Sequence, residues 1–151
     1  MVALLAPIPI GHLDSGLAVC AAEGKVAFGS RSWEVFRELD AARKGMPVDV
    51  YIYASWSGPQ EVRAATWRAV YVGHVECIVG AHPAGMRFRP PSTGQNESDN
   101  AGHWAVFWEV RDLRRVDETE FIPTGQFTGH GKRRAYRDNF APEGPLLVEH
   151  P

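Results

Sequence analysis

The sequence predicts an α+β fold that is mainly β: a small, strongly bent barrel of five to six strands with one or two short helices. Short apolar runs separated by Gly and Pro indicate the strands, and these runs hold most of the five Trp, four Tyr and seven Phe. One long run contains a central glycine, as strands do where a barrel turns a corner. A length of 151 residues fits one domain, residues 1–151. An open α+β sheet is the alternative.

Composition and charge bound the class of protein. Hydrophobic residues make up 44% of the chain and charged residues 23%, which is typical of a soluble globular protein and excludes a disordered or coiled-coil chain. The net charge of -2 does not indicate nucleic-acid binding through overall charge, although a local basic patch is compatible with it. Residues 1–11 are too short for a membrane span and lack the basic start of a signal peptide. We therefore expect a cytoplasmic protein without a membrane partner, with Cys20 and Cys77 reduced.

The first part of the chain predicts a strand, a helix and a second strand. Residues 2–5 are apolar and form the first strand, which the Pro7-Ile8-Pro9 segment ends because proline donates no hydrogen bond to a central ladder. Residues 12–22 predict a short helix that Gly24 closes. Residues 25–28 predict a short strand.

The best-defined helix covers residues 33–44. Ser32 is placed as its N-cap, and Glu34 lies in the first turn, where the helix dipole favours a negative charge. Apolar residues recur on one face of this helix, and Gly45 ends it.

Three longer strands and a closing strand follow. Residues 48–56 alternate between apolar side chains and a mixed aromatic and polar set, which is typical of a strand with one buried face. Residues 67–79 form the next strand, in which Gly73 predicts a bulge or a sharp bend. Residues 104–110 form the third, and residues 146–149 close the sheet.

Two long segments connect these elements. Residues 81–103 are rich in Pro, Gly, Ser and Asn and exceed an ordinary connection, so they are either a mobile functional loop or a simple insertion. Residues 117–121 predict a single helical turn. Residues 125–139 form a basic loop that contains glycines.

Spacing argues against two familiar chemistries. The glycines of the basic loop approach a phosphate-binding loop, but their spacing is one residue too long and Arg133 stands where Ser or Thr is needed. Strand alternation puts His74 and Cys77 on opposite faces, so these two residues and His82 do not predict a shared ion. We expect no metal and no cofactor.

Aromatic, hydroxyl and guanidinium side chains gather at two predicted strand ends. Such a set can stack on a planar ligand and hydrogen-bond to its edge, whereas the competing interpretation is that the aromatic residues fill the core. The candidate ligand-binding residues are Ser30, Arg31, Trp33, Tyr53, Ser55, Trp56 and Ser57.

The basic loop supplies a second candidate surface. A cationic loop that includes an aromatic residue can follow a phosphate backbone, and a solvated surface loop is the alternative. The candidate backbone-binding residues are Lys132, Arg133, Arg134 and Arg137.

Four motifs lie in an order typical of one superfamily. They are Pro7-Ile8-Pro9 followed by His12, the segment Gly24-Lys25-Val26-Ala27-Phe28, the strand end Tyr53-Ala54-Ser55, and a strand with the central Gly73. In this order they resemble the PUA-like superfamily, most closely its EVE-type domains and a related prokaryotic family of unknown function. The resemblance covers roughly residues 5 to 80 and, weakly, 104–116. It implies a small bent barrel that binds RNA or a modified DNA base in an aromatic-lined pocket, often without chemistry of its own.

The ASCH group, a more distant sibling, has a Gly-x-Lys-x-x-Glu-x-Arg motif, and some members look like amide hydrolases that use a lysine and an acid. Here Phe28 stands where that glutamate is expected, and Arg31 is displaced by one position. On this resemblance Lys25 and Glu76 form the acid–base pair only if the fold brings them together.

These observations favour a non-enzymatic binding module for RNA or a modified nucleobase. One alternative is a small hydrolase of a modified nucleoside or amide, with Lys25 and Glu76 as the acid–base pair. The other is an interaction domain that docks a protein partner through residues 81–103.

Overall fold

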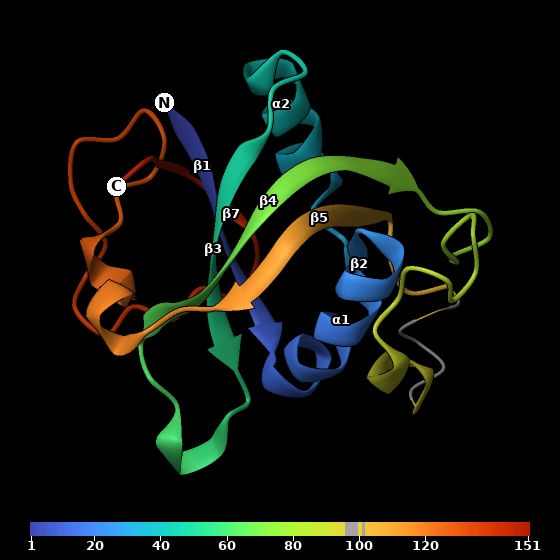
Figure 1. The fold of residues 1–151 in the computed structure, drawn as a ribbon. Coiled ribbons are helices and arrows are strands. Elements are labelled where there is room, and N and C mark those ends of the chain that lie inside the picture. The colour runs from blue at the N-terminus through green and yellow to red at the C-terminus, as the bar shows by residue number, and fades with distance from the viewer. Residues whose placement is uncertain (96–99, 101) are drawn as a thin grey trace.

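The computed structural model describes residues 1–95, 100 and 102–151, which form an α+β fold (Figure 1). In these residues two α-helices accompany one mixed sheet of seven strands. The helices are α1 (Ile10–Glu23) and α2 (Trp33–Arg43). The strands are β1 (Val2–Pro9), β2 (Val26–Ser30), β3 (Val48–Ser55), β4 (Ala64–Glu76), β5 (Val106–Arg115), β6 (Ile122–Pro123) and β7 (Leu146–Glu149).

The sheet is open. Its strands are hydrogen-bonded in the order β2-β5-β4-β3-β1-β7, and β6 pairs with β4. Only β1 and β3 run parallel in the ladders of the described residues. Within the same residues β2 and β7 share no ladder, so the sheet is not closed into a barrel. The predicted α+β class is confirmed, whereas barrel closure is wrong and the open-sheet alternative holds.

The second half of β1 leaves an unpaired edge beside the sheet's last strand. β7 has four residues and pairs only with residues 2–5 of β1. Pro7 and Pro9 therefore lie beyond the end of β7, and proline is tolerated at a strand edge because it has no N–H to donate. The sequence predicts that the Pro7-Ile8-Pro9 segment ends this strand after residue 5. β1 instead continues to Pro9 because β3 pairs with its other side as far as Ser55.

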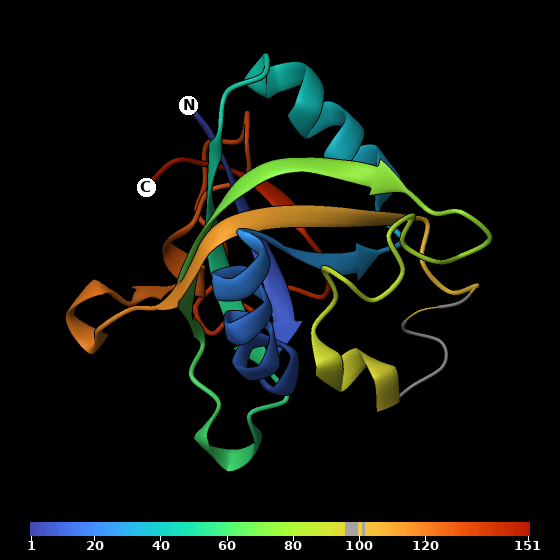
Figure 2. The same cartoon turned by 45° about the vertical axis from the view of Figure 1, so that its right-hand side comes forward.

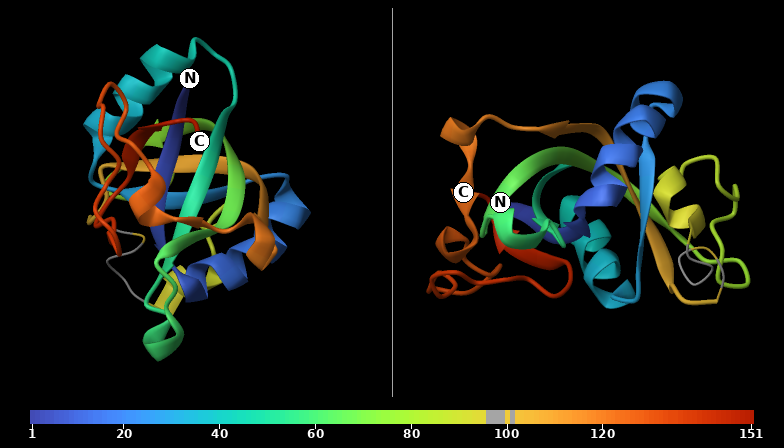
Figure 3. Two further views of the ribbon diagram at one scale, coloured as in Figure 1. Left: turned by 90° about the vertical axis from the view of Figure 1, so that its left-hand side faces the viewer. Right: turned by 90° about the horizontal axis from the view of Figure 1, so that it is seen from below.

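Two irregularities bend the long strands β4 and β5, which curve around the interior of the fold (Figure 2, Figure 3). The β4–β5 register shifts between Tyr71 and Gly73, and Gly73 has a φ of 148°. This confirms the bulge predicted at Gly73. A second shift lies opposite Asp112, whose φ is 55°. An extra residue in one strand of a pair increases its twist and bends it.

The two faces of the sheet bury separate cores. Along β1, Leu4 belongs to the larger core and Leu5 to the smaller one, because successive side chains of a strand point to opposite faces. Both helices contribute to the larger core, α2 at the top of Figure 1 and α1 at its lower right. The smaller core lies under the C-terminal segment and includes the fully buried Phe127.

Most predicted elements are confirmed, with shifted ends. α1 begins at Ile10 and ends before Gly24, whose left-handed backbone lets its N–H bond the Cys20 carbonyl at 2.9 Å. α2 is confirmed, but Ser32 caps it with no side-chain hydrogen bond. β4 begins three residues before the predicted residue 67, and β5 extends to Arg115. A single helical turn forms at residues 118–120, as predicted.

No helix in the described part of the chain has the length and apolar character that crossing a membrane requires.

Phe36 is the aromatic residue through which α2 holds the bent strands. It is fully buried and stacks on Tyr71 of β4 and Trp108 of β5, with ring centroids 6.0 and 5.6 Å away. We predict that Phe36→Ala lowers the free energy of unfolding by about 3–5 kcal/mol because it leaves a cavity between helix and sheet. Urea unfolding measures this change. Glu38→Ala, an exposed change on the same helix, is the control, and equal losses in the two variants would contradict the prediction.

Candidate functional site

A pocket of about 740 Å³ opens between the ends of strands that are not neighbours in the sheet. Its walls include residues 6–9 of β1 and residues 28–30 of β2. Three strands separate β1 from β2 in the hydrogen-bonded order, so both can line one pocket only because the sheet bends round. Residues 141–145 complete the rim. The pocket therefore lies where the bent sheet remains open.

Aromatic side chains dominate the walls of this pocket. They come from three strands and from the segments that follow β3 and precede β5, so they surround the space from several sides. They are Phe28, Tyr53, Trp56, Trp104 and Trp108. Rings placed around a cavity of this size can stack on a flat ligand.

Five of the seven predicted ligand-binding residues line the pocket. They are Ser30, Arg31, Tyr53, Ser55 and Trp56. The pocket walls do not include Trp33, which is 42% exposed and packs against the guanidinium of Arg37. They also do not include Ser57, whose hydroxyl donates to the Ala54 carbonyl at 3.2 Å and so stabilises the turn after β3.

Trp56 stands at the mouth of the pocket. Its side chain is 83% exposed, and its φ of 58° is unusual for a residue other than glycine. Its N–H donates to a carboxylate oxygen of Glu61 at 3.2 Å, while the other oxygen of Glu61 is 3.6 Å from the Arg63 guanidinium. These contacts hold the turn that carries Trp56.

Tyr53 contributes a hydroxyl group to the pocket wall. Its side chain is buried, and its hydroxyl accepts a hydrogen bond from Arg63. Burial, assisted by a hydrogen bond with Glu61, raises the pKa of Tyr53 to about 12. The phenol is therefore neutral at physiological pH and available to a ligand as a hydrogen-bonding group.

Arg31, which follows β2, is hydrogen-bonded to His103 in the segment that precedes β5. Its guanidinium donates to the His103 carbonyl at 3.2 Å and lies 2.8 Å from the ring nitrogen Nδ1 of His103. The next residue, Trp104, lies against Gly29 of β2, and a Cβ built on Gly29 would come within 2.4 Å of the indole. The absence of a side chain at Gly29 therefore decides where Trp104 stands.

Basic side chains outnumber acidic ones around the pocket. Arg31, Arg63 and Arg89 line it together with Glu61 and Glu143. Arg89 is only 2% exposed, and its guanidinium donates to the Ala27 carbonyl at 2.7 Å. In a chain with a net charge of -2, this excess of arginine favours a ligand with acceptor or anionic groups.

The long segment 81–103 packs against the body of the protein at several of its described residues, whereas residues 83–87 are exposed. The Ala27 N–H of β2 donates to the Phe88 carbonyl at 2.7 Å, and the Ser92 hydroxyl lies 2.6 Å from Nδ1 of His12 in α1. Residues 96–99 and 101 of this predicted loop lie outside the described residues. The loop thus contributes walls to the pocket through Arg89, Thr93 and its end at Trp104.

The middle of the basic loop, around Gly131, lies away from the pocket, although the chain that follows the loop reaches the pocket rim at Ala141. The Gly131 N–H donates to the Glu149 carboxylate at 2.7 Å, which places the loop beside the end of β7 and the start of β1. The pocket is lined by residues 6–9, in the second half of β1, so four to seven strand residues, roughly 13–23 Å, separate it from the Gly131 part of the loop. Lys132 and its neighbours Arg133 and Arg134 are exposed there. Arg137 is also exposed; its carbonyl lies close to Gly125.

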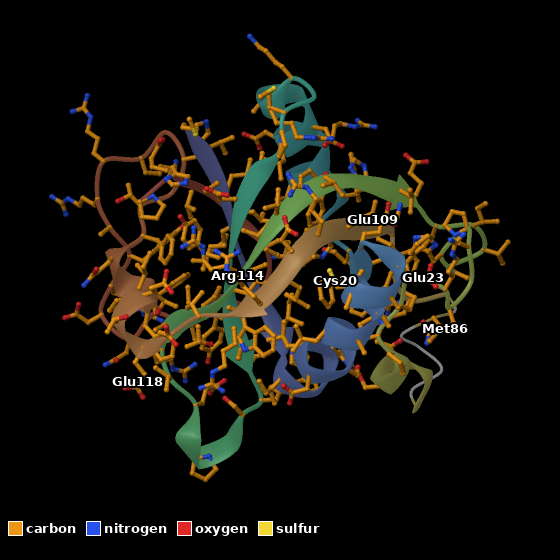
Figure 4. All side chains as sticks on the ribbon, in the orientation of Figure 1. Cys20, Glu23, Met86, Glu109, Arg114 and Glu118 are labelled. Carbon is orange, nitrogen blue, oxygen red and sulfur yellow. The ribbon has the colours of Figure 1, made fainter. Side chains whose placement is uncertain are left out.

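Lys25 and Glu76, the predicted pair of the hydrolase alternative, lie beside different parts of β5: Lys25 near its middle and Glu76 at its start. Lys25 precedes Val26, which pairs with Val110, whereas Glu76 pairs with Val106. The separation along the strand is on the order of 15 Å. Lys25 instead donates to the buried carboxylate of Glu109 at 3.1 Å. Glu109 is labelled on β5 in Figure 4.

The histidines and cysteine weighed as metal ligands have separate partners. His74 contacts Asp40 at 2.6 Å, Cys77 donates to the Trp104 carbonyl, and His82 contacts Glu109 at 3.2 Å. Among residues 1–95, 100 and 102–151 no group of three or more His, Cys, Asp or Glu side chains could hold a metal ion.

Sequence reasoning missed several walls of the pocket. The sequence pattern predicts Phe28, Trp104 and Trp108 only as strand residues, and it gives no reason to select Arg63 or Arg89 as site residues. Local patterns gave no signal for them, because each reaches the pocket only through the bend of the sheet or the packing of a long loop.

Comparison with known proteins adds no relative: no family model matches the chain, and neither a curated protein nor a solved structure matches it significantly.

Gly29 offers a direct test of the wall geometry. We predict that Gly29→Ala displaces Trp104 and lowers the free energy of unfolding by about 1–3 kcal/mol, because the new methyl group overlaps the indole. Tryptophan emission and urea unfolding measure both effects. Gly11→Ala is the matched control: its Cβ meets nothing within 4 Å and it lies in α1, so it should stabilise the protein by about 0.5–1 kcal/mol. An unchanged emission spectrum in Gly29→Ala would contradict the prediction.

The raised pKa of Tyr53 predicts a loss of stability at high pH. The unfolded phenol loses its proton near pH 10.0, whereas the folded phenol keeps it to about pH 12. The neutral phenol therefore makes its full contribution to the free energy of unfolding below pH 10, and that contribution declines as the pH rises towards 12. Urea unfolding between pH 9 and 12 should therefore show a shallower decline in Tyr53→Phe than in the wild-type protein. Parallel declines would mean that Tyr53 does not titrate in this window.

Proposed function

We propose that the chain is a non-enzymatic binding module that takes a base of single-stranded RNA, or a modified nucleobase, into the pocket between β1 and β2. The observation that carries this proposal is the set of five aromatic walls around one cavity, accompanied by three arginines. Base–aromatic stacking contributes about 1–3 kcal/mol per base, so two walls and a few hydrogen bonds are enough for micromolar binding.

The polar groups of the pocket suit the edge of a base and its sugar. The Ser55 hydroxyl can donate or accept a hydrogen bond. The Ser30 hydroxyl already accepts from the Ser32 N–H at 3.0 Å and the Tyr53 phenol from Arg63, and each oxygen keeps a second lone pair for a ligand. The guanidinium of Arg31 lies on the same rim, where a phosphate next to the inserted base would pass. Stacking walls with a few fixed polar groups are the usual composition of a small-ligand site.

We also propose that the fold is a PUA-like domain of the EVE type whose barrel stays open. The motifs at residues 7–9, 24–28 and 53–55 support membership of this superfamily. Two of these motifs also line the pocket, through Pro7, Pro9 and Tyr53. The strong bend at Gly73 supports it as well.

The distance between the pocket and the basic loop makes the binding length-dependent. A nucleoside fills only the pocket, whereas an oligonucleotide can also reach Lys132, Arg133 and Arg134. Each phosphate that these side chains neutralise releases condensed counterions and adds salt dependence. The proposal therefore expects tighter and more salt-sensitive binding as the strand lengthens.

A fluorescence titration with short single-stranded oligonucleotides tests the site, using RNA and DNA with and without modified bases. We predict that wild-type emission is quenched saturably and that Trp56→Ala weakens binding by about tenfold or more. Trp33→Ala is the matched control because Trp33 is an exposed tryptophan outside the pocket. Equal affinities of the two variants would remove Trp56 from the site, and the absence of any saturable response in the wild-type protein would overturn the proposal.

A second titration tests the role of the basic loop. We predict that the triple variant Lys132→Ala, Arg133→Ala and Arg134→Ala binds a mononucleotide as the wild-type protein does but binds a long oligonucleotide more weakly, with a lower salt dependence. The measurement is the affinity at two salt concentrations for each ligand. An unchanged salt dependence with the long oligonucleotide would restrict binding to the pocket itself.

A further inference from the structure

Trp108 forms an inner wall of the pocket and is firmly held. It lies on β5, is 3% exposed, and packs against Phe28 and Phe36 with ring centroids 5.2 and 5.6 Å away. Phe28 also lines the pocket, whereas Phe36 lies behind it in the core under α2. The indole is therefore clamped between the pocket and the core, with little freedom to turn.

The indole N–H of Trp108 has no hydrogen-bond acceptor among the residues that the structure describes. In that part of the chain every fully buried side-chain nitrogen or oxygen has a partner. The Trp108 nitrogen is thus not fully buried, although almost all of the residue is. Trp108 is one of the residues that line the pocket, so the pocket is a space that the exposed part of its side chain can face.

We infer that the Trp108 N–H is the donor with which the pocket selects a hydrogen-bond acceptor on the inserted base, a carbonyl oxygen or an unprotonated ring nitrogen. This inference rests on the proposed function. An indole N–H only donates, so it cannot serve an amino or methyl group at the same position. A base without the acceptor leaves the N–H unpaired in a desolvated site and so loses binding free energy. This loss discriminates between ligands more strongly than a difference in apolar contact does.

Within the pocket, different tryptophans stack on the base and select its hydrogen-bond acceptor. Trp56 and Trp104 come from segments outside the strands and can stack on any base, because every base has an aromatic face. Trp108 lies near the start of β5, a strand that is paired on both sides, and is fixed by Phe28 and Phe36. A donor fixed in this way discriminates between ligands without a change in the protein, as preorganised sites do.

A double-mutant cycle between protein and ligand tests the inference. The first change replaces Trp108 with 3-benzothienylalanine, which keeps the shape of the indole and substitutes sulfur for N–H. The second change removes or weakens one acceptor in a short single-stranded RNA: guanosine to 7-deazaguanosine, adenosine to 7-deazaadenosine, and uridine to 2-thiouridine or 4-thiouridine. The same replacement at Trp33, outside the pocket, is the control.

We expect at least one altered base to bind the wild-type protein about tenfold more weakly and the Trp108 variant with no further loss. Additive losses for every base would overturn the inference while leaving base binding intact. If the wild-type protein binds none of the RNAs, the proposed function fails and the inference fails with it.

Nuclear magnetic resonance of the wild-type protein provides a second measurement that requires no variant. The Trp108 indole signal, assigned through contacts with the ring protons of Phe28 and Phe36, should move downfield when the preferred RNA saturates the pocket. It should stay near its free position with the matching acceptor-altered RNA. An identical shift with both RNAs would show that this N–H does not distinguish the acceptor.

Discussion

The bend of β4 and β5 around the stacked rings of Phe36, Tyr71 and Trp108 is the constraint on which the rest of the structure depends. Burial of these rings favours a sheet that wraps around α2, and the register shift at Gly73 gives the strands the curvature to do so. Through this bend β2, at one edge of the sheet, comes to share a pocket with β1, near the other edge. A flat sheet of the same order would keep these strands apart.

The bent sheet does not close into a barrel because its edge at β1, beyond the end of β7, is unsuited to pairing with a further strand. β7 is short and leaves Pro7 and Pro9 of β1 unpaired, and proline cannot donate to a further strand. The space left between the edges is lined by side chains rather than closed by backbone pairing. Trp104 occupies part of it because Gly29 presents no side chain there. The candidate site is thus the unclosed part of the sheet, lined by rings that would otherwise complete a core.

Charge is divided between two places on the molecule. Three arginines surround the pocket, two of them held by carbonyl groups and one by Tyr53 and Glu61, so their positions are fixed before any ligand arrives. The exposed cations of the basic loop lie at the opposite end of β1, beside Glu149. The first set favours contact with one nucleotide and the second contact with a longer strand. The protein as a whole remains slightly acidic.

The sequence by itself determined the α+β class, the helix at residues 33–43, the strands around residues 48–55 and 146–149, and the bulge at Gly73. These features depend on alternation, helical spacing and glycine, all of which act over a few residues. Five of the candidate ligand-binding residues could also be found, because they cluster at strand ends. Only the tertiary structure decided that the sheet stays open, that Lys25 pairs with Glu109 rather than Glu76, and that Trp104 and Trp108 line the pocket. Each of those outcomes depends on the packing of segments far apart in the chain, which no local pattern encodes.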